Sequence, residues 1–150
     1  MTLGDILKLK EAVIEQFTVK TNEDIELGEF VCNDGNGILA ATAALAVVGK
    51  PMIALEAHDY SEVSTHKISC LVRGVGIAQK VSGSGAAKKG QKLMISGTAG
   101  ECTLFVKGAV SAANTFATAT DQAALDTNAG AFGEAYSDSL DADIVQEVRL

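Results

Sequence analysis

The sequence has no tryptophan, and phenylalanine and tyrosine together make up only 5% of its 150 residues. Carbohydrate sites normally present exposed aromatic rings beside convergent polar groups, so this scarcity argues against a sugar-binding module. Hydrophobic residues nevertheless reach 47%, enough for a core built from Val, Ile, Leu and Ala. The length corresponds to one domain, or to two small halves that share a core.

Cysteine and histidine are also scarce, with three and two residues. No C-x-x-C occurs, whereas a zinc site needs ligand pairs a few residues apart. Cys32, Cys70 and Cys102 each fall in a run typical of a strand, which predicts buried free thiols in a reducing compartment. His58 and His66 leave a metal or acid–base role open, but a third ligand is missing, so we favour a structural or solvent-facing pair.

Basic residues number 12 against 19 acidic residues, giving a net charge of −7. Such a chain repels phosphate backbones, so nucleic acid is not an expected partner. The glycine-rich stretch from Lys80 to Gly97 lacks the Gly-Lys-Ser/Thr step of a phosphate loop, and Leu93 to Gly97 predicts a strand ending at a turn where a helix should start. We interpret the stretch as a linker and expect no nucleotide or other cofactor.

Long apolar runs are missing too. The longest, from Ile38 to Val48, is too short for a bilayer, which needs about 20 residues. Charged residues at 5, 8, 10 and 11 interrupt the start of the chain, so it does not resemble an export signal. These features predict a soluble, unexported protein with no membrane partner.

What the sequence does contain is short alternating runs separated by glycine turns. Ile68, Cys70 and Val72 alternate within 67–73, and 102–107 and 144–150 show the same period of two. Turn signals occupy 33–37, 83–85 and 97–100. This pattern predicts a mainly β fold, a compact β-barrel or sandwich.

Two segments fit helices. Residues 40–48 are rich in alanine and predict a helical turn or two. Residues 3–17 place apolar side chains at near-helical spacing, although 13–20 would also serve as a strand.

An internal echo divides the chain. "LGEFVCNDGNGI", "IALEAHDYSE" and "ISCLVRG" are followed in the same order by "KGQKLMISGTAGEC", "AFGEAYSDSL" and "IVQEVRL". The matched positions are Gly28 with Gly90, Gly37 with Gly100, Glu56-Ala57 with Glu134-Ala135, Val72-Arg73 with Val148-Arg149, and Ile68 with Ile144. The echo predicts a duplicated unit, with halves at about 25–74 and 87–150 inside one β-rich domain at 21–150. Residues 1–20 would form an N-terminal arm or a first strand.

The order of these motifs, with "LGEFVCNDGNG" and "VRG" recurring in weaker form, resembles the capsid cement or head decoration proteins of tailed phages and related viruses. The resemblance covers roughly residues 11–150 and includes the lead-in "VIEQFTVKTNEDIELGEFV". It implies a β-tulip-like fold, a place on the outer capsid surface of a virion made in the host cytoplasm, the major capsid protein as partner, and self-association as a homotrimer. It implies no catalytic residue. The insert at 107–130 and residues 1–10 depart from the simplest members.

Two further sets of residues, one acidic and one of cysteines, are candidates for metal binding or catalysis. The acidic set Glu134, Asp138, Asp141, Asp143 and Glu147 could hold calcium but lacks the twelve-residue loop pattern, so a solvated turn and strand edge is favoured. Cys70 or Cys102 as a nucleophile is weaker than burial, because alternation puts both on the same face as Ile68, Val72, Leu104 and Val106. The sequence thus predicts no enzyme.

Two non-enzymatic functions remain: a virion decoration protein, and a cellular β-barrel module for a ligand or sugar. The first assigns a role to the exposed apolar side chains of the leader, Leu3, Ile6, Leu7 and Leu9, which would dock on the capsid and order on binding. The alternative is that residues 1–20 pack on their own domain as a helix or an edge strand.

Overall fold

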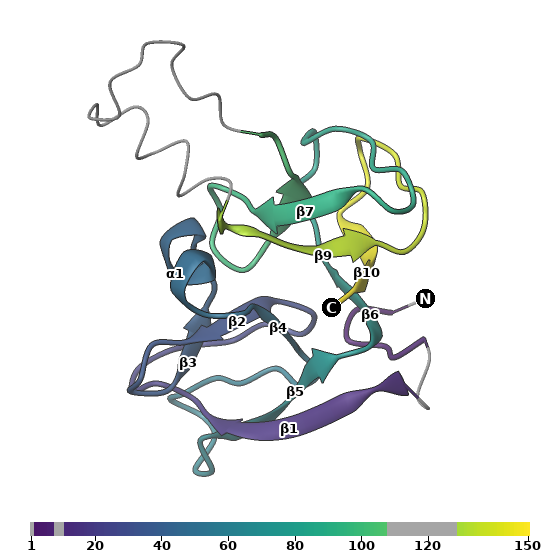
Figure 1. The fold of residues 1–150 in the computed structure, drawn as a ribbon. Helices are drawn as coiled ribbons and strands as arrows, with labels where there is room; N and C mark the ends of the chain where they lie inside the picture. The colour runs from purple at the N-terminus through teal and green to yellow at the C-terminus, as the bar shows by residue number, and fades with distance from the viewer. Residues whose placement is uncertain (1, 8–10, 108–128) are drawn as a thin grey trace, which may run out of the picture.

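The computed structural model describes residues 2–7, 11–107 and 129–150, which form two five-stranded antiparallel sheets stacked as a sandwich (Figure 1). The first sheet has the order β1-β5-β4-β2-β3 and the second β6-β10-β9-β7-β8. The strands are β1 (Val13–Thr18), β2 (Phe30–Asn33), β3 (Ile38–Ala40), β4 (Met52–Ala54), β5 (Lys67–Arg73), β6 (Val75–Gln79), β7 (Lys92–Ile95), β8 (Cys102–Leu104), β9 (Ala131–Ala135) and β10 (Val145–Arg149). The predicted mainly β class is confirmed.

One short helix, α1 (Ala43–Val48), connects β3 to β4 where the alanine-rich run predicted it. Thr42 begins the helix, since its side-chain oxygen accepts a hydrogen bond from the N–H of Leu45, and Gly49 ends it. Residues 13–18 form a strand, the second of the two alternatives for the leader region, so the helical interpretation of 3–17 was wrong there.

The period of two is confirmed in β5. Ile68 and Cys70 are buried on one face, while Leu71 is buried on the other. Both faces are covered because the first sheet packs against the second sheet on one side and against its own loops on the other. This explains why β5 is less strictly alternating than a half-exposed strand.

The two sheets are copies of one topology. Adding five to each strand number of the first sheet gives the strand order of the second. Gly28 and Gly90 occupy equivalent turns, as predicted: the N–H of Gly28 donates to the carbonyl of Ala54 in β4 (2.9 Å), and the N–H of Gly90 to that of Ala135 in β9 (2.7 Å). The predicted duplication is therefore present in the backbone.

The register of the copies differs from the sequence prediction. Since Ala54 and Ala135 are equivalent, the match of Glu56-Ala57 with Glu134-Ala135 is wrong by three residues. Ala54 pairs with Cys70 and Ala135 with Val148, so Val148 corresponds to Cys70 and the match with Val72 is wrong by two. An even shift leaves side chains on the same face, which is why alternation alone could not detect it.

The remaining matches shift as well. In the first unit the N–H of Asp34 donates to the carbonyl of Gly37, and in the second unit the N–H of Ser96 donates to the carbonyl of Glu101. Gly37 therefore corresponds to Glu101 rather than to Gly100. Ile144 precedes β10 and is exposed, so its match with buried Ile68 was wrong.

The unit boundary falls at Gly74, between β5 and β6. The expected halves, 25–74 and 87–150, omit the first strand of each unit, because β6 begins the second unit as β1 begins the first. The stretch from Lys80 to Gly97 is therefore not a linker between copies: residues 80–91 are the second unit's version of the β1–β2 connection, and β7 follows within the same stretch. Gly74 has φ +127°, and this conformation lets the chain pass from one sheet to the other in a single residue.

The core lies between the sheets. Phe30 of β2 and Phe132 of β9 meet edge to face at 5.0 Å between ring centroids, and aliphatic side chains from both sheets surround them. A second cluster lies within the first unit alone, formed by Val19, Ile25, Val31, Ile38, Met52, Ala54, Ile68 and Cys70. The units thus share one core, and the first has another of its own.

The β7–β8 turn contacts the first unit around Phe30 and Ala41, and we call this contact the seam between the units. Gly100 accepts a hydrogen bond from the N–H of Phe30 and donates to the carbonyl of Ala41, both at 2.8 Å. Its φ of +78° is costly for other residues, and a methyl group there would overlap the Glu29 side chain. A glycine is required because backbone and carboxylate approach each other so closely.

Replacing Gly100 with alanine should destabilise the protein by about 2 kcal/mol or more, from the positive φ and the overlap with Glu29. Gly97→Ala, in the same turn with no atom within 4 Å of the added carbon, is the matched control and should change stability by no more than about 0.5 kcal/mol. Urea unfolding measures both. Equal losses in the two variants would contradict the role of the close approach.

Glu29 itself is nearly buried in this seam. Burial raises the pKa of its carboxyl above the ordinary 4.5, the N–H of Glu26 lowers it in part, and the charges of Glu26 and Glu101 raise it again. A raised folded pKa means that the contribution to stability is greatest below pH 4.5 and is lost as pH rises through the folded value.

Glu29→Gln should therefore increase the free energy of unfolding at pH 7, because the amide keeps an acceptor for the Glu26 N–H without the buried charge. The gain should shrink as pH falls toward 4.5. Thermal melts of both proteins from pH 7 to pH 4 test this, and a gain that is independent of pH would refute the electrostatic cause.

Candidate functional site

The leader packs on its own domain. Residues 4–7 run along the edge of β6: Gly4 and Leu7 donate to the carbonyls of Ile77 (3.0 Å) and Val75 (2.9 Å), and Ile77 donates to Asp5 (3.0 Å). Ile6 forms a bridge with Gly76. The segment thus covers a sheet edge that would otherwise be open to pairing with another chain.

The predicted docking side chains are only partly available. Leu3, Ile6 and Leu7 are half-buried; Ile6 packs against the shared core, and Leu3 lies against Gly28. Leu9 lies outside the described residues. This arrangement matches the packed alternative, and capsid docking by these residues stays a prediction.

The two histidines come together with a tyrosine. His58 Nε2 lies 3.2 Å from His66 Nδ1, and the ring of Tyr60 stacks on His66 with 3.9 Å between centroids. His58 is 3% exposed, and its backbone exchanges two hydrogen bonds with Ile25. Each imidazole thus supplies a hydrogen-bond partner for one nitrogen of the other, which fits the structural interpretation. Within residues 2–7, 11–107 and 129–150, no three His, Cys, Asp or Glu side chains form a group that could hold a metal ion.

All three cysteines are buried free thiols, as predicted. Burial raises the pKa of Cys32 to about 11 and that of Cys70 and Cys102 to about 12. A nucleophilic cysteine needs a lowered pKa and exposure, so these thiols have the opposite character. Val106, expected on the same face as Cys102, is 70% exposed, because β8 ends at Leu104.

The acidic set in the second unit is dispersed among separate partners. Glu134 pairs with Arg149 (3.2 Å), and Asp138 pairs with Lys88 (3.0 Å). Asp141 accepts from the N–H of Gly85, and Asp143 from the N–H of Leu140. The pKa of Asp138 is lowered by its hydrogen bonds to the N–H of Lys89 and the ammonium of Lys88. These carboxylates order turns.

The Gly83–Gly90 loop leads into a strand, as expected, since β7 begins at Lys92. Lys88 is engaged by Asp138, and the Lys89 ammonium lies 5.1 Å from the centre of the Tyr136 ring. Neither lysine points into a phosphate cradle closed by a helix.

Sequence reasoning missed Lys80, which is 3% exposed. Its ammonium donates to the carbonyl oxygens of Leu140 (3.1 Å), Asp141 and Asp143 (both 3.4 Å). Three acceptors match the three N–H donors of a lysine, and this compensates for burying the charge. The equivalent residue of the first unit is Val19, because the N–H groups of Val19 and Lys80 donate to His66 and Ile144 respectively. An aligned repeat would have placed this lysine at a buried position.

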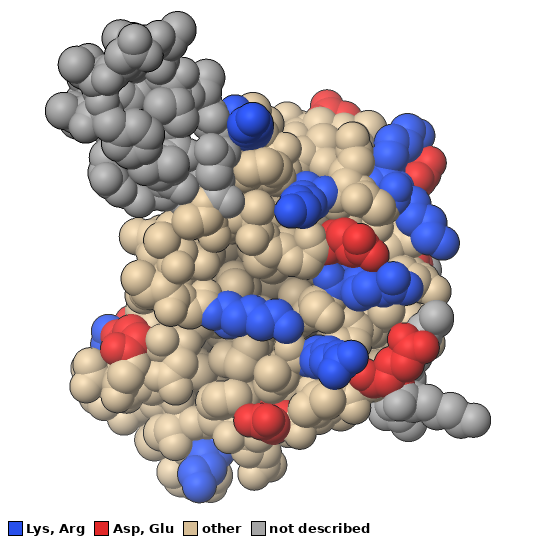
Figure 2. All heavy atoms as spheres, in the orientation of Figure 1, with Lys and Arg blue, Asp and Glu red and all other residues tan. Residues whose placement is uncertain are grey.

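Charge is distributed unevenly, which the net value of −7 conceals. Figure 2 shows lysines and arginines gathered on the face seen in Figure 1. Lys50, Arg73, Lys92 and Arg149 are exposed. Lys50 donates to the carbonyl of Val72 and Leu150 to that of Gly74, and Lys92 and Arg149 both lie opposite Glu134 of β9. We call these four the basic face.

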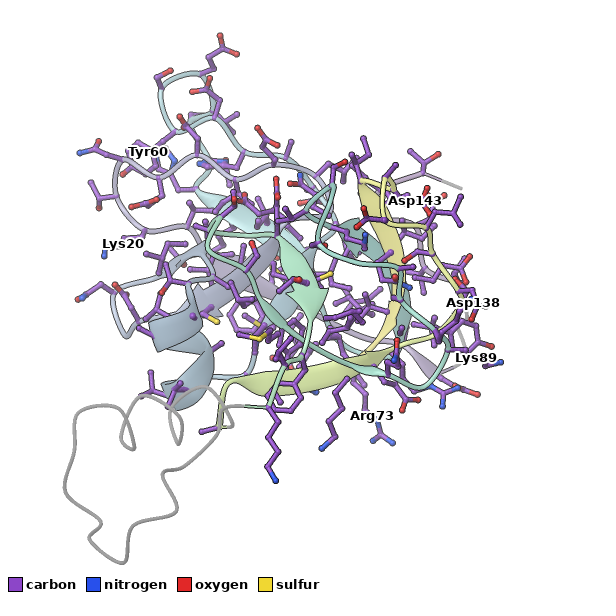
Figure 3. All side chains as sticks on the ribbon, turned by 90° about the horizontal axis from the view of Figure 1, so that it is seen from above. Lys20, Tyr60, Arg73, Lys89, Asp138 and Asp143 are labelled. Carbon is purple, nitrogen blue, oxygen red and sulfur yellow. The ribbon has the colours of Figure 1, made fainter. Side chains whose placement is uncertain are left out.

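Acidic residues gather elsewhere, in the loops of the first unit and in the β7–β8 turn that approaches them. Asp24 accepts from the N–H of Tyr60, and Glu23, Glu26 and Glu101 lie close enough to Glu29 to affect its pKa. In Figure 3, Arg73 and Tyr60 lie on opposite sides of the molecule. The charges are therefore distributed unevenly over the surface, an arrangement suited to directional contacts.

A groove beside the basic face is lined by residues 46–51 and 131–133 and has a volume of about 330 Å³. We call it the α1–β9 groove. Val48 is 81% exposed on its rim, and Phe132 is mostly buried at its base. Because this aromatic ring is covered, the groove lacks the open stacking face typical of sugar sites.

The fold occurs in a phage capsid. A chain of the capsid of Myoviridae phage XM1 superposes with a TM-score of 0.61 at 18% sequence identity, and the match covers 99% of this chain and 89% of that chain. At this identity the similarity establishes a common fold. No protein-family model and no curated protein matches the sequence. Among the described residues, no helix has the length and apolarity to traverse a membrane.

The thiols generate a prediction. At pH 8 the native protein should react with a thiol reagent more than about a hundredfold more slowly than the protein in 8 M urea, where all three cysteines become accessible. The absorbance of the product released in each reaction gives the number of reacted thiols. Rapid modification of one cysteine in the native protein would show that this thiol is accessible to solvent and would contradict the prediction.

Proposed function

We propose that this protein is a structural component of a tailed-phage virion that binds the outside of the assembled capsid and stabilises it. The observation that carries the proposal is the superposition of nearly the whole chain on a chain of the phage XM1 capsid. Because both chains are covered almost end to end, the shared architecture is the entire domain rather than a common motif. The motif order of the sequence supports the same class.

The surface suits such a role. A decoration protein must stay soluble as free copies and then make many identical contacts, which symmetry multiplies across the particle. The net charge of −7 keeps free copies apart, while the basic face offers a region where a negatively charged neighbour is accepted. We propose the major capsid protein as one partner and a homotrimer as the assembled form.

The leader is proposed as part of the docking surface. Its segment 4–7 is already held by β6, so binding would need only side-chain reorientation and not the ordering of a free arm. Burying the exposed parts of Leu3 and Leu7 would contribute roughly 25 cal/mol for each Å² of apolar surface covered.

Purified protein mixed with capsids assembled without it should bind to saturation at a fixed number of copies per particle. The variant Leu7→Ser with Leu9→Ser should bind at least about tenfold more weakly, because apolar anchors are lost while the backbone pairing with β6 is kept. Cosedimentation with densitometry measures both. Deleting the segment would be a poorer test, since it also uncovers the β6 edge.

The control is Val63→Ser, another exposed apolar residue, in the His58–His66 loop. Equal occupancy by all three proteins would remove the leader from the interface. Absence of binding by the unmodified protein would refute the proposed function itself.

A further inference from the structure

The turn at residues 140–144 displays two large apolar side chains. Leu140 is 70% exposed and Ile144 is 65% exposed, and both lie on the same short turn that leads into β10. Single exposed apolar residues are common, but two neighbouring ones on one rigid turn resemble the anchors of a protein–protein interface.

The turn is held in place from several directions. The Lys80 ammonium binds three of its carbonyl oxygens, Gly83 donates to Asp141 (2.8 Å), and Ser82 donates to Ala142 (3.3 Å). The Asp143 carboxylate also closes the turn on Leu140 (2.6 Å). A pre-organised turn loses little conformational entropy on binding. The first unit has Val19 in place of Lys80, so this clamp belongs to the second unit alone.

The α1–β9 groove offers matching chemistry. Its volume of about 330 Å³ lies within the range of protein binding pockets, and its lining is apolar apart from backbone groups and Lys50. The turn in contrast carries Asp141 and Asp143 and no basic residue. Apolar anchors beside two carboxylates therefore complement a groove whose side chains are apolar except for Lys50.

We infer that the 140–144 turn of one copy docks in the α1–β9 groove of a neighbouring copy. Leu140 and Ile144 cover Val48 and Phe132, and Lys50 lies beside the carboxylates of the turn. The inference rests on the self-association in the proposed function and specifies the contact. The alternating charges would also let a chain of net charge −7 bind itself.

The geometry makes this contact directional. Figures 1 and 3 place α1 and the end of the chain that contains Asp143 on opposite flanks of the molecule. A contact between turn and groove joins two different surfaces and is therefore head-to-tail; such contacts close into rings when the rotation between copies permits.

Two double variants separate the two surfaces. The turn variant is Leu140→Ser with Ile144→Ser, and the groove variant is Val48→Asp with Lys50→Glu. All four side chains are exposed, so folding is preserved, as circular dichroism and urea unfolding will verify. In sedimentation velocity, each variant alone should be monomeric at concentrations where the unmodified protein associates, with association weakened at least about tenfold.

An equimolar mixture of the two variants gives the decisive result. One intact groove and one intact turn remain across each mixed pair, so the mixture should form dimers and nothing larger. Val106→Ser, a residue of equal exposure outside both surfaces, should associate like the unmodified protein. A mixture that stays monomeric, variants that associate normally, or an unmodified protein that is monomeric at every concentration would each overturn the inference.

Capsid binding measured in parallel keeps the two proposals apart. If the unmodified protein binds capsids but never associates through these surfaces, the contact is wrong and the proposed function stands. If it associates as described but binds no capsid, the proposed function is wrong and the contact stands.

Discussion

The sandwich depends on the approach of the Gly100 backbone to the first sheet. This one residue accepts from Phe30 and donates to Ala41, so the second unit is tied into the hydrogen bonding of β2 and of the residue that follows β3. The same approach positions the edge-to-face contact of Phe30 with Phe132. It also encloses Glu29, an ionisable group that an ordinary core would exclude. The seam is therefore strongly specified and, at neutral pH, electrostatically strained.

The two units share one strand topology and differ in the side chains that they carry at equivalent positions. Equivalent hydrogen bonds relate Val19 to Lys80 and His66 to Ile144. In the first unit this position is an apolar contact beside a ring cluster of histidines and Tyr60; in the second it is a lysine that fixes a turn. The same backbone thus holds a partly buried ring cluster in one copy and two exposed apolar side chains, Leu140 and Ile144, in the other.

Much of the fold could be predicted from the sequence, because alternation in β5, the glycine turns and the alanine-rich helix are local signals. The order of motifs also identified a duplicated unit and the equivalence of Gly28 with Gly90. Register could not be predicted, since shifts by two residues keep the same face buried and the copies share few identities. The unit boundary was missed because β1 and β6 have no identical residues at equivalent positions, and only their pairing with β5 and β10 reveals them as equivalents.

The candidate site was less predictable. Burial of the cysteines followed from alternation, but exposure of Ile144 and Val106 depends on where β10 begins and β8 ends. The role of Lys80 depends on carbonyl groups about 60 residues away, and the basic face on residues from three strands and a loop, so neither has a local signature.

The separate hydrophobic cluster of the first unit affects the order in which the two units can fold. That cluster is complete once residue 73 has left the ribosome, so the first five strands can collapse around their own side chains during synthesis. Most buried apolar side chains of the second unit belong to the core shared with the first. The second unit therefore packs onto the sheet of the first unit, which is synthesised earlier.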